Sequence, residues 1–321
     1  MPTVTMDLHS HQFERKVKSR DYWREADKRG IDVMAITEHT HFDAKKSFDV
    51  LLAEKPRNKI LVPGLELNSS IGHTLCLAPT PEIYSEKKLF EFGVDIETAS
   101  DIAKKHGALL VAAHPWGYQH DSAAFLVGPK QVLKLMRRLN LGIEAYNGMV
   151  GHLSDIIYDS AWVRKPFNFL AFLEKNKFTR TVGLGRIGGR LKKNMDASIW
   201  NTLARVSAGT ELGEKASFIT AGSDAHTADR VGEGMMKISA DEELKTPFDV
   251  LELIQQKKRM VWCGVGVEEI RPGVYKKIKR SNITGSEIWD GIKYATKRTV
   301  TEKVWKKIRR NKKAGTKEAA E

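Results

Sequence analysis

The chain has 321 residues, of which 41% are hydrophobic and 29% charged, and its formal net charge is +13. This composition excludes a collagenous, a disulfide-stapled and a wholly disordered protein and supports a sizeable core. The length fits two ordinary domains or one α/β barrel. The two cysteines, Cys76 and Cys263, lie in apolar runs and are expected to be buried thiols in a reducing compartment.

No stretch of the sequence is long and apolar enough to predict a membrane span. The longest apolar run, residues 108–113, is far shorter than the roughly 18–20 residues that a spanning helix needs. The first residues carry neither a basic start nor an apolar segment, so we expect no signal peptide and a cytoplasmic location.

Short apolar runs alternate with amphipathic stretches along the chain. The expected strands are residues 4–8, 33–37, 60–62 with 65–67, 74–77, 108–113, 142–145, 218–221 and 260–267. The expected helices are residues 20–29, 96–106, 129–139, 166–175, 198–208 and 247–257. Alternating strands and helices predict an α/β fold with a mostly parallel sheet or barrel.

Residues 149–215 are the least regular segment, and they contain the glycine-rich stretch G-L-G-R-I-G-G-R at residues 183–190. The spacing of these glycines matches neither a dinucleotide-binding motif nor a P-loop. We expect a flexible loop over the mouth of the barrel. It forms an inserted, loop-rich part of a single barrel domain that spans residues 1–275.

The positive charge is concentrated at the end of the chain. Residues 276–321 contain 15 Lys and Arg against 5 Asp and Glu, about +10 of the net charge. Apolar positions between residues 286 and 313 recur at nearly helical spacing, which predicts a basic amphipathic tail with a disordered end. Such a tail can pack on its own barrel, bind nucleic acid or contact an anionic membrane surface, and the sequence leaves these alternatives open.

Histidines and carboxylates stand at or near the ends of most apolar runs. The segments that carry them read D-L-H-S-H, T-E-H-T-H, P-G-L-E-L-N, G-H-T-L, A-H-P-W, E-A-Y-N-G and G-S-D-A-H. Two H-x-H pairs occur where about 0.3 are expected by chance. Residues two apart in a strand point to the same side, so His9 and His11 can bind one ion together. Imidazoles and carboxylates at buried strand ends indicate a cation, and mixed N and O ligands favour Zn, Mn or Fe.

In this order, the motifs resemble those of the PHP (polymerase and histidinol phosphatase) superfamily over about residues 4–240. The resemblance implies a distorted (β/α)7 barrel with two or three divalent metal ions at its C-terminal mouth, and hydrolysis of phosphoesters. It also implies a set of ligands: His9, His11 and Asp224 on one ion, Glu66 bridging to a second, His73 and His114 on the second, and His39 and His226 on a third. Another ligand often follows the first H-x-H in this family, where this chain offers Glu14 or Asp21, so two and three ions both remain open. The length leaves no room for a polymerase domain, and we expect a free-standing member.

Further residues near these motifs are candidates for supporting roles. Asp7 and Glu38 are expected to lie behind the ligands and orient them. His226 and His41 are candidate catalytic groups that could protonate the leaving oxygen. The candidate substrate-binding residues are Arg186, Arg190, Arg230 and Trp116.

Three functions compete on these observations. The first is a metal-dependent phosphoesterase that hydrolyses a phosphomonoester or a nucleotide phosphoester through a metal-bridged hydroxide. The second is a nuclease that acts on DNA or RNA with help from the basic tail. The third is a non-catalytic, metal-stabilised binding module, which the filled ligand positions disfavour. We favour the first slightly, while the exact substrate and the oligomeric state stay open.

Overall fold

A computed structural model describes residues 3–13, 16–117, 121–152, 161–195, 211–256, 260–264, 267–271, 274–277 and 289. The strands are β1 (Thr3–Asp7), β2 (Val33–Ile36), β3 (Ile60–Ser69), β4 (Gly72–Leu77), β5 (Leu109–Ala112), β6 (Gly142–Asn147), β7 (Ile219–Gly222), β8 (Gly234–Ser239), β9 (Met260–Gly264), β10 (Val267–Arg271) and β11 (Val274–Lys277). The α-helices are α1 (Ser19–Lys28), α2 (Ala44–Ala53), α3 (Ile96–Lys105), α4 (Ala123–Leu126), α5 (Pro129–Leu139), α7 (Ala161–Lys175), α8 (Lys177–Thr181), α9 (Leu184–Met195), α11 (Glu211–Lys215) and α12 (Pro247–Gln255). Short 3₁₀ helices are η1 (Pro81–Ser85), η2 (Lys87–Phe90) and η4 (Ala228–Arg230).

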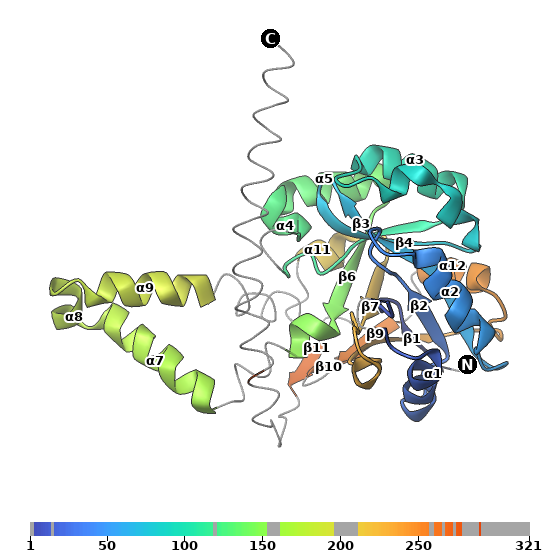
Figure 1. The fold of residues 1–321 in the computed structure, drawn as a ribbon. Coiled ribbons are helices and arrows are strands. Elements are labelled where there is room, and N and C mark those ends of the chain that lie inside the picture. The colour runs from blue at the N-terminus through green and yellow to red at the C-terminus, as the bar shows by residue number, and fades with distance from the viewer. Residues whose placement is uncertain are drawn as a thin grey trace, which may run out of the picture.

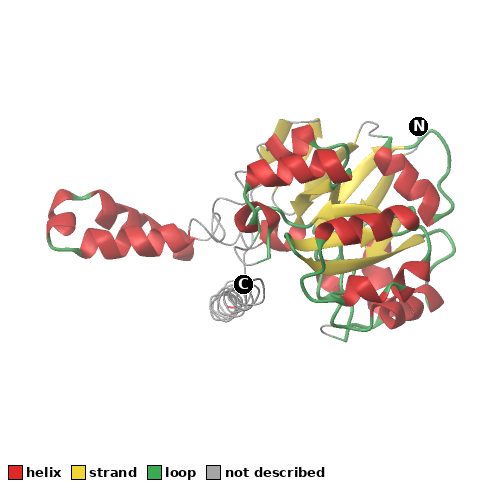
Figure 2. Ribbon diagram, turned by 90° about the horizontal axis from the view of Figure 1, so that it is seen from above, coloured by secondary structure: helices red, strands yellow, loops and turns green. Residues whose placement is uncertain are grey.

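The strands form one sheet in the order β11-β10-β9-β8-β1-β2-β3-β4-β5-β6-β7. It curves into a nearly closed barrel with helices packed around it (Figures 1 and 2). The pairs β1–β2, β2–β3, β5–β6 and β6–β7 are parallel, whereas β4 and β8 to β11 pair antiparallel with their neighbours. The sheet is therefore mixed, not mostly parallel as the alternation predicted, because the chain reverses direction between β3 and β4 and again between β8 and β9, where α12 forms part of the connection.

The barrel closes where the segment after β7 meets the segment after β1. The amide of Leu8 donates to the carbonyl of Ala221 at 3.2 Å, and the amide of Asp224 donates to the carbonyl of His9 at 2.7 Å. Next along the seam, the amide of His11 donates to the carbonyl of Ala225 at 2.8 Å. These bonds join residues more than 200 positions apart at the same end of the barrel.

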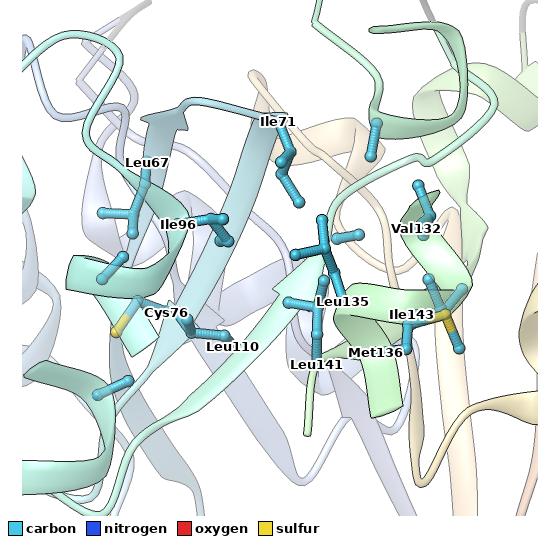
Figure 3. Packing of buried hydrophobic residues seen from close by; sticks show 14 of the residues in the cluster. Leu67, Ile71, Cys76, Ile96, Leu110, Val132, Leu135, Met136, Leu141 and Ile143 are labelled. Atoms are coloured by element: carbon cyan, nitrogen blue, oxygen red, sulfur yellow. The ribbon is translucent and has the colours of Figure 1, made fainter. Parts of the chain in front are cut away.

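Side chains alternate along the strands between the barrel interior and the helical layer, as a period of two requires. In β2, Val33 and Ala35 belong to the interior cluster, while Met34 and Ile36 pack in the cluster of α1 and α2. A third cluster fills the space between β3 to β6 and the helices α3 and α5 (Figure 3). It includes Cys76, and burial raises the pKa of this thiol to about 12. The interior of the barrel is thus apolar, and the polar groups gather at its end.

Most of the predicted elements are present, with informative differences. The expected strands 60–62 and 65–67 are one strand, β3, which runs through Pro63 and Gly64, and the expected strand 260–267 is two strands. The strand β8 and the helix α2 were missed. The predicted helix 198–208 and almost all of the predicted tail lie outside the described residues. Among the described helices, none is both long and apolar enough to cross a bilayer.

The glycine-rich segment is helical, so the expectation of a flexible loop was wrong. Gly185 and Gly188 of α9 face α7, and a Cβ atom at Gly188 would lie 3.1 Å from the carbonyl oxygen of Leu170 and from Cβ of Leu173. Glycine at these positions lets the two helices approach closely, and this packing outweighs the low helix propensity of glycine. Helices α7, α8 and α9 form a hairpin that projects from the barrel in both views (Figures 1 and 2).

A methyl group at Gly222 is expected to destabilise the barrel at its seam. A Cβ atom there would lie 2.5 Å from the backbone nitrogen of His9, which cannot move without breaking the seam. We expect Gly222→Ala to lower the free energy of unfolding by about 2 kcal/mol or more in urea titrations. Gly213→Ala is the control, because no atom lies within 4 Å of its added Cβ and the residue is helical. Equal stability of the two variants would contradict this account of the seam.

Candidate metal centre

The eight side chains that the sequence proposes as ligands lie together at one end of the barrel. They come from the ends of β1, β2, β5 and β7, from β3, and from the start of β4, which runs antiparallel to β3 and so begins at the same end. Contacts of 2.7–3.6 Å link the carboxylates and imidazoles of this group: His9, His11, His39, Glu66, His73, His114, Asp224 and His226. The convergence matches the expectation, while their role as ligands stays a prediction.

Glu66 is the central group of this cluster. It is fully buried on β3, and both of its carboxylate oxygens face imidazole nitrogens. Its Oε2 lies 2.9 Å from Nδ1 of His39, 3.3 Å from Nε2 of His11 and 3.6 Å from Nε2 of His9. Its Oε1 lies 2.7 Å from Nδ1 of His73 and 3.2 Å from Nε2 of His114. One carboxylate thus connects ligand candidates from both halves of the barrel.

Asp224 is the second carboxylate of the cluster. Its Oδ1 lies 3.2 Å from Nε2 of His11 and 3.6 Å from Nδ1 of His226. The backbone of Asp224 is in the left-handed region with φ of +52°, and His114 has φ of +28°. Such conformations cost free energy in residues other than glycine and concentrate at functional sites. Here the seam hydrogen bond from Asp224 to His9 holds the strained turn in place.

Burial and charge act in opposite directions on these groups. Burial alone would raise the pKa of Glu66, but the imidazoles of His73, His39 and His9 outweigh it and hold that pKa well below its usual range. Burial would lower the pKa of His11, but the carboxylates of Asp224 and Glu66 raise it to about 10. Without cations, protons on His9, His11 and His114 therefore balance the buried carboxylates, whereas burial lowers the pKa of His39 to about 4.

Glu144 on β6 positions two of the histidines, a role that the sequence analysis did not assign. Its Oε1 accepts from Nδ1 of His9 at 2.9 Å, and its Oε2 accepts from the backbone amide of His114 at 2.6 Å. Asn147 donates to Glu144 at 3.1 Å and to Asp224 at 3.2 Å, which ties the two carboxylates together. The only signal in the sequence was a carboxylate and an amide near a strand end, in E-A-Y-N-G.

Asp7 and Glu38 lie behind the ligand candidates, where they were expected. Asp7 accepts from the amides of Ser223 and Gly232, both at 2.8 Å, and so it fastens the seam. Burial raises its pKa to about 6. Glu38 accepts from the amides of Gln12 and Phe13, and its Oε2 lies 3.9 Å from Nδ1 of His11.

Glu38 also belongs to a buried polar network that sequence reasoning missed. Ser47 donates to both Glu38 and Gln12 at 3.1 Å, and Gln12 donates to Ser19 at 2.9 Å. These side chains come from α1, α2 and the segment after β1. They fix the path of the chain immediately after His11, which no pattern of residue types could reveal in advance.

The geometry of the cluster fits divalent ions. Three groups of ligand atoms each lie within 4.8 Å of one another: His11, His39 and His226; His9, His11 and Glu66; and His39, Glu66 and His73. Within the described part of the chain, the buried Oε2 of Glu66 accepts no hydrogen bond of good geometry, although three imidazole nitrogens surround it. A cation is bound by imidazole nitrogens and carboxylate oxygens whose lone pairs point to a common centre. Imidazole with carboxylate suits Zn, Mn or Fe.

The remaining candidates are less close to the cluster. His41 is exposed, with its ring 5.2 Å from that of His39. Trp116 is buried against Phe125 in the cluster of α3 and α5, a position that favours packing over contact with substrate. Arg230 donates to Glu233 at 3.0 Å.

Among the other two arginines and the extra acidic residues, the structure describes the side chains of Arg186 and Asp21, and neither joins the cluster. Arg186 is exposed on α9, in the hairpin that projects from the barrel (Figure 1). Arg190 follows on the same helix, and its side chain lies outside what the structure describes. Asp21 pairs with Arg24 on α1, and Glu14 lies outside the described residues.

Comparison with known protein families supports the resemblance. A family model described as PHP-associated matches residues 217–258, which include Asp224, His226 and β8. This match bears out the resemblance for the last of the seven motifs, G-S-D-A-H. The other six motifs of the resemblance lie upstream of the match and carry the other ligand candidates. A comparison with curated proteins finds no match.

Solved structures resemble this chain only distantly. A two-domain protein from Bacteroides vulgatus that contains a predicted PHP-like metal-dependent phosphoesterase is 16% identical, with a TM-score of 0.49 over 82% of this chain and 65% of that one. A lesion-specific endonuclease from Pyrococcus furiosus is 14% identical, with a TM-score of 0.44 over 81% and 57%. An amidohydrolase from Chromobacterium violaceum is 12% identical, with a TM-score of 0.41 over 77% and 95%. The chain spans less than two thirds of the first two proteins, and at these scores the likenesses carry no inference about activity.

Removal of the charge on Glu144 is expected to weaken metal binding without removing a ligand. Glu144→Gln keeps the size of the side chain but loses the carboxylate that holds Nδ1 of His9. Loss of such an outer partner typically costs about 10–100-fold in metal affinity. Competition with a chelator would measure the change. Glu86→Gln is the matched control, because Glu86 also pairs with a histidine, His106, at 2.7 Å but outside the cluster. Unchanged affinity in Glu144→Gln would contradict the positioning role.

Binding of Zn²⁺ or Mn²⁺ at pH 7.5 is expected to release protons. Carboxylates raise the pKa of His11 to about 10 and that of His114 to about 9, against the opposing effect of burial. Both imidazoles therefore carry protons in the metal-free protein at this pH and must lose them to become ligands, so affinity rises with pH up to about 10, the pKa of His11. Calorimetry in buffers of different ionisation enthalpy measures the protons released. A value near zero would show that these imidazoles do not take part.

Proposed function

We propose that this protein is a metal-dependent hydrolase of phosphoesters, acting on a phosphomonoester or a nucleotide phosphoester. The observation that carries the proposal is the buried pair of carboxylates, Glu66 and Asp224, within a cage of imidazoles at the end of a barrel. A cluster that needs cations also attracts an anionic group at the same place. When bound, divalent ions would offset the negative charge of a phosphate group and make a water molecule more acidic.

The residues divide into sets that would hold the ions. His9, His11 and Asp224 lie around one centre, and Glu66 stands between this centre and the pair His73 and His114. His39 and His226 lie beside His11, with ring centroids 4.6 Å and 4.5 Å from its ring, and His39 also contacts Glu66. This arrangement supports two ions or three.

Hydrogen bonds prepare two imidazoles for such a role. Nδ1 of His9 faces the carboxylate of Glu144, and Nδ1 of His226 lies 2.9 Å from the backbone carbonyl of Asp224. Both partners are acceptors, so each Nδ1 carries the proton in the neutral ring. The Nε2 atoms of His9 and His226 then keep their lone pairs for a cation or a proton.

The burial of the histidines indicates where substrate would enter. His9, His11 and His114 are buried, whereas His39, His73 and His226 are half-buried and His41 is exposed. The half-buried side is the open side of the cluster. A phosphoester that approaches there meets His41 and His226, which we propose as the groups that protonate the leaving oxygen. Arg230 lies four residues after His226 and remains a candidate for substrate binding, while its pair with Glu233 holds it near the seam.

Substitution of the central carboxylates tests the proposal directly. Asp224→Asn and Glu66→Gln are expected to lose bound metal and to lower phosphoester turnover by at least about a hundredfold, because buried imidazoles alone do not neutralise the ions. Elemental analysis and hydrolysis of an aryl phosphate provide the two measurements. Glu86→Gln serves again as control and should change neither. Full turnover in metal-depleted Asp224→Asn would refute the assignment.

A panel of substrates separates the competing activities. An aryl phosphomonoester, an aryl phosphodiester, mononucleotides, bisphosphorylated nucleotides and short DNA and RNA are compared with the intact chain. Preference for monoesters or nucleotides supports the proposal, whereas preference for oligonucleotides supports the nuclease alternative with the basic tail. Metal binding without hydrolysis of any substrate in the panel would support the third alternative, a non-catalytic binding module.

A further inference from the structure

The hairpin of α7, α8 and α9, residues 161–195, has an apolar face that nothing in the described structure covers. Its two long helices are antiparallel, because Leu173 of α7 meets Gly185 of α9 while Leu170 meets Gly188. A Cβ atom at Gly185 would lie 3.1 Å from the carbonyl oxygen of Leu173. The described contact thus packs the hairpin through glycine and leucine, and it leaves Phe169 and Phe172 exposed.

Helical geometry places four large apolar residues on one side of this hairpin. Phe169 and Phe172 each precede a leucine of α7 that contacts α9, and Leu184 and Ile187 each precede a glycine of α9 that contacts α7. Consecutive residues of a helix differ by a rotation of about 100° about its axis, so each of these four side chains points about 100° away from the contact residue that follows it. Because the helices are antiparallel, these rotations turn both pairs towards the same side. Consistently, Gly189 and Glu174, which follow contact residues, lie against each other on the opposite side.

The apolar side is strongly exposed. The side chains of Phe169, Phe172, Leu184 and Ile187 are 59%, 56%, 47% and 57% exposed. With Phe178 and Val182 near the tip, the hairpin supplies six of the eleven large hydrophobic residues that are exposed in the described part of the chain. Exposed apolar residues that gather in this way mark an interaction surface.

The charge of the hairpin selects the kind of partner. Residues 161–195 contain nine Lys and Arg and a single acidic residue, Glu174. Lys165, Lys175 and Lys177 are exposed around the apolar side, and Arg186 is exposed on the other side. Two such hairpins would repel each other, which disfavours a second copy of this chain as the occupant. Aliphatic side chains such as Leu184 and Ile187 have no partner on a nucleic acid backbone.

We propose that the hairpin binds the surface of an anionic lipid membrane. Phe169, Phe172, Leu184 and Ile187 enter the boundary between headgroups and acyl chains, and the lysines and arginines contact anionic headgroups. A large apolar face combined with a basic polar face is the pattern of helices that lie in the membrane interface. The inference does not depend on the proposed hydrolase activity.

A fluorescent probe at the apolar face tests the proposal on the intact chain. An environment-sensitive dye is attached to Phe172→Cys in a Cys263→Ser background, where the remaining Cys76 is buried. Vesicles of phosphatidylcholine with 30% phosphatidylglycerol are expected to shift its emission to the blue, and pure phosphatidylcholine is not. Phe248→Cys is the matched control, since Phe248 is 60% exposed on α12 of the barrel. Recruitment through the basic tail alone would leave both probes unchanged and would overturn the proposal.

A second pair of variants measures the contribution of the apolar face. Phe172→Ser with Ile187→Ser is expected to weaken sedimentation with the anionic vesicles by at least about tenfold, whereas Phe248→Ser is not. Circular dichroism checks that the helices persist. If the probe at residue 172 responds to oligonucleotides and not to vesicles, the apolar face binds nucleic acid. If the double variant loses a dimer that the unchanged chain forms, the face binds a second copy. Either result would refute membrane binding.

Discussion

The structure depends on the burial of two carboxylates at the end of an apolar barrel. Glu66 and Asp224 repel each other and are removed from water, which costs several kcal/mol for each charge unless it is compensated. The imidazoles around them provide that compensation only when they carry protons or hold cations. A protein with no use for ions could fill the same positions with apolar residues at no loss of stability. On the proposed function, cation binding at this cluster also contributes to the stability of the fold.

The same backbone closes the barrel and shapes the site. Asp224 donates its amide to the carbonyl of His9, and Asp7 holds the amide of Ser223, so ligand candidates and seam residues alternate along the chain. Gly222 permits this close approach because a side chain would collide with His9. Distortion of the seam must displace ligands, and displacement of ligands must loosen the seam. Fold stability and metal affinity should then change together in variants at this end of the barrel, and separately elsewhere.

Sequence alone indicated that these imidazoles and carboxylates converge, because strand ends and histidine pairs leave a local pattern. D-L-H-S-H and G-S-D-A-H are each visible within five residues, and parallel strands bring such ends together. The role of Glu144 was not visible, since it depends on where β6 lies relative to β1. Strand β8 was missed because Lys237 interrupts its apolar run. The glycine-rich helix α9 was misjudged because its stability comes from contact with α7, which local propensity does not contain.

The histidine cluster and the hairpin of α7, α8 and α9 differ in which of their side chains are exposed. In the cluster, the deeply buried His9, His11 and His114 are suited to retain ions, and the half-buried His39 and His226 leave one side open to a substrate. In the hairpin the order is reversed: glycines lie inside, and aromatic residues face outward. The large apolar side chains are exposed, while glycines form the contact between the helices. The stability of the hairpin itself does not explain this placement. A second surface must therefore receive them, and the surrounding lysines and arginines indicate that this surface is negatively charged.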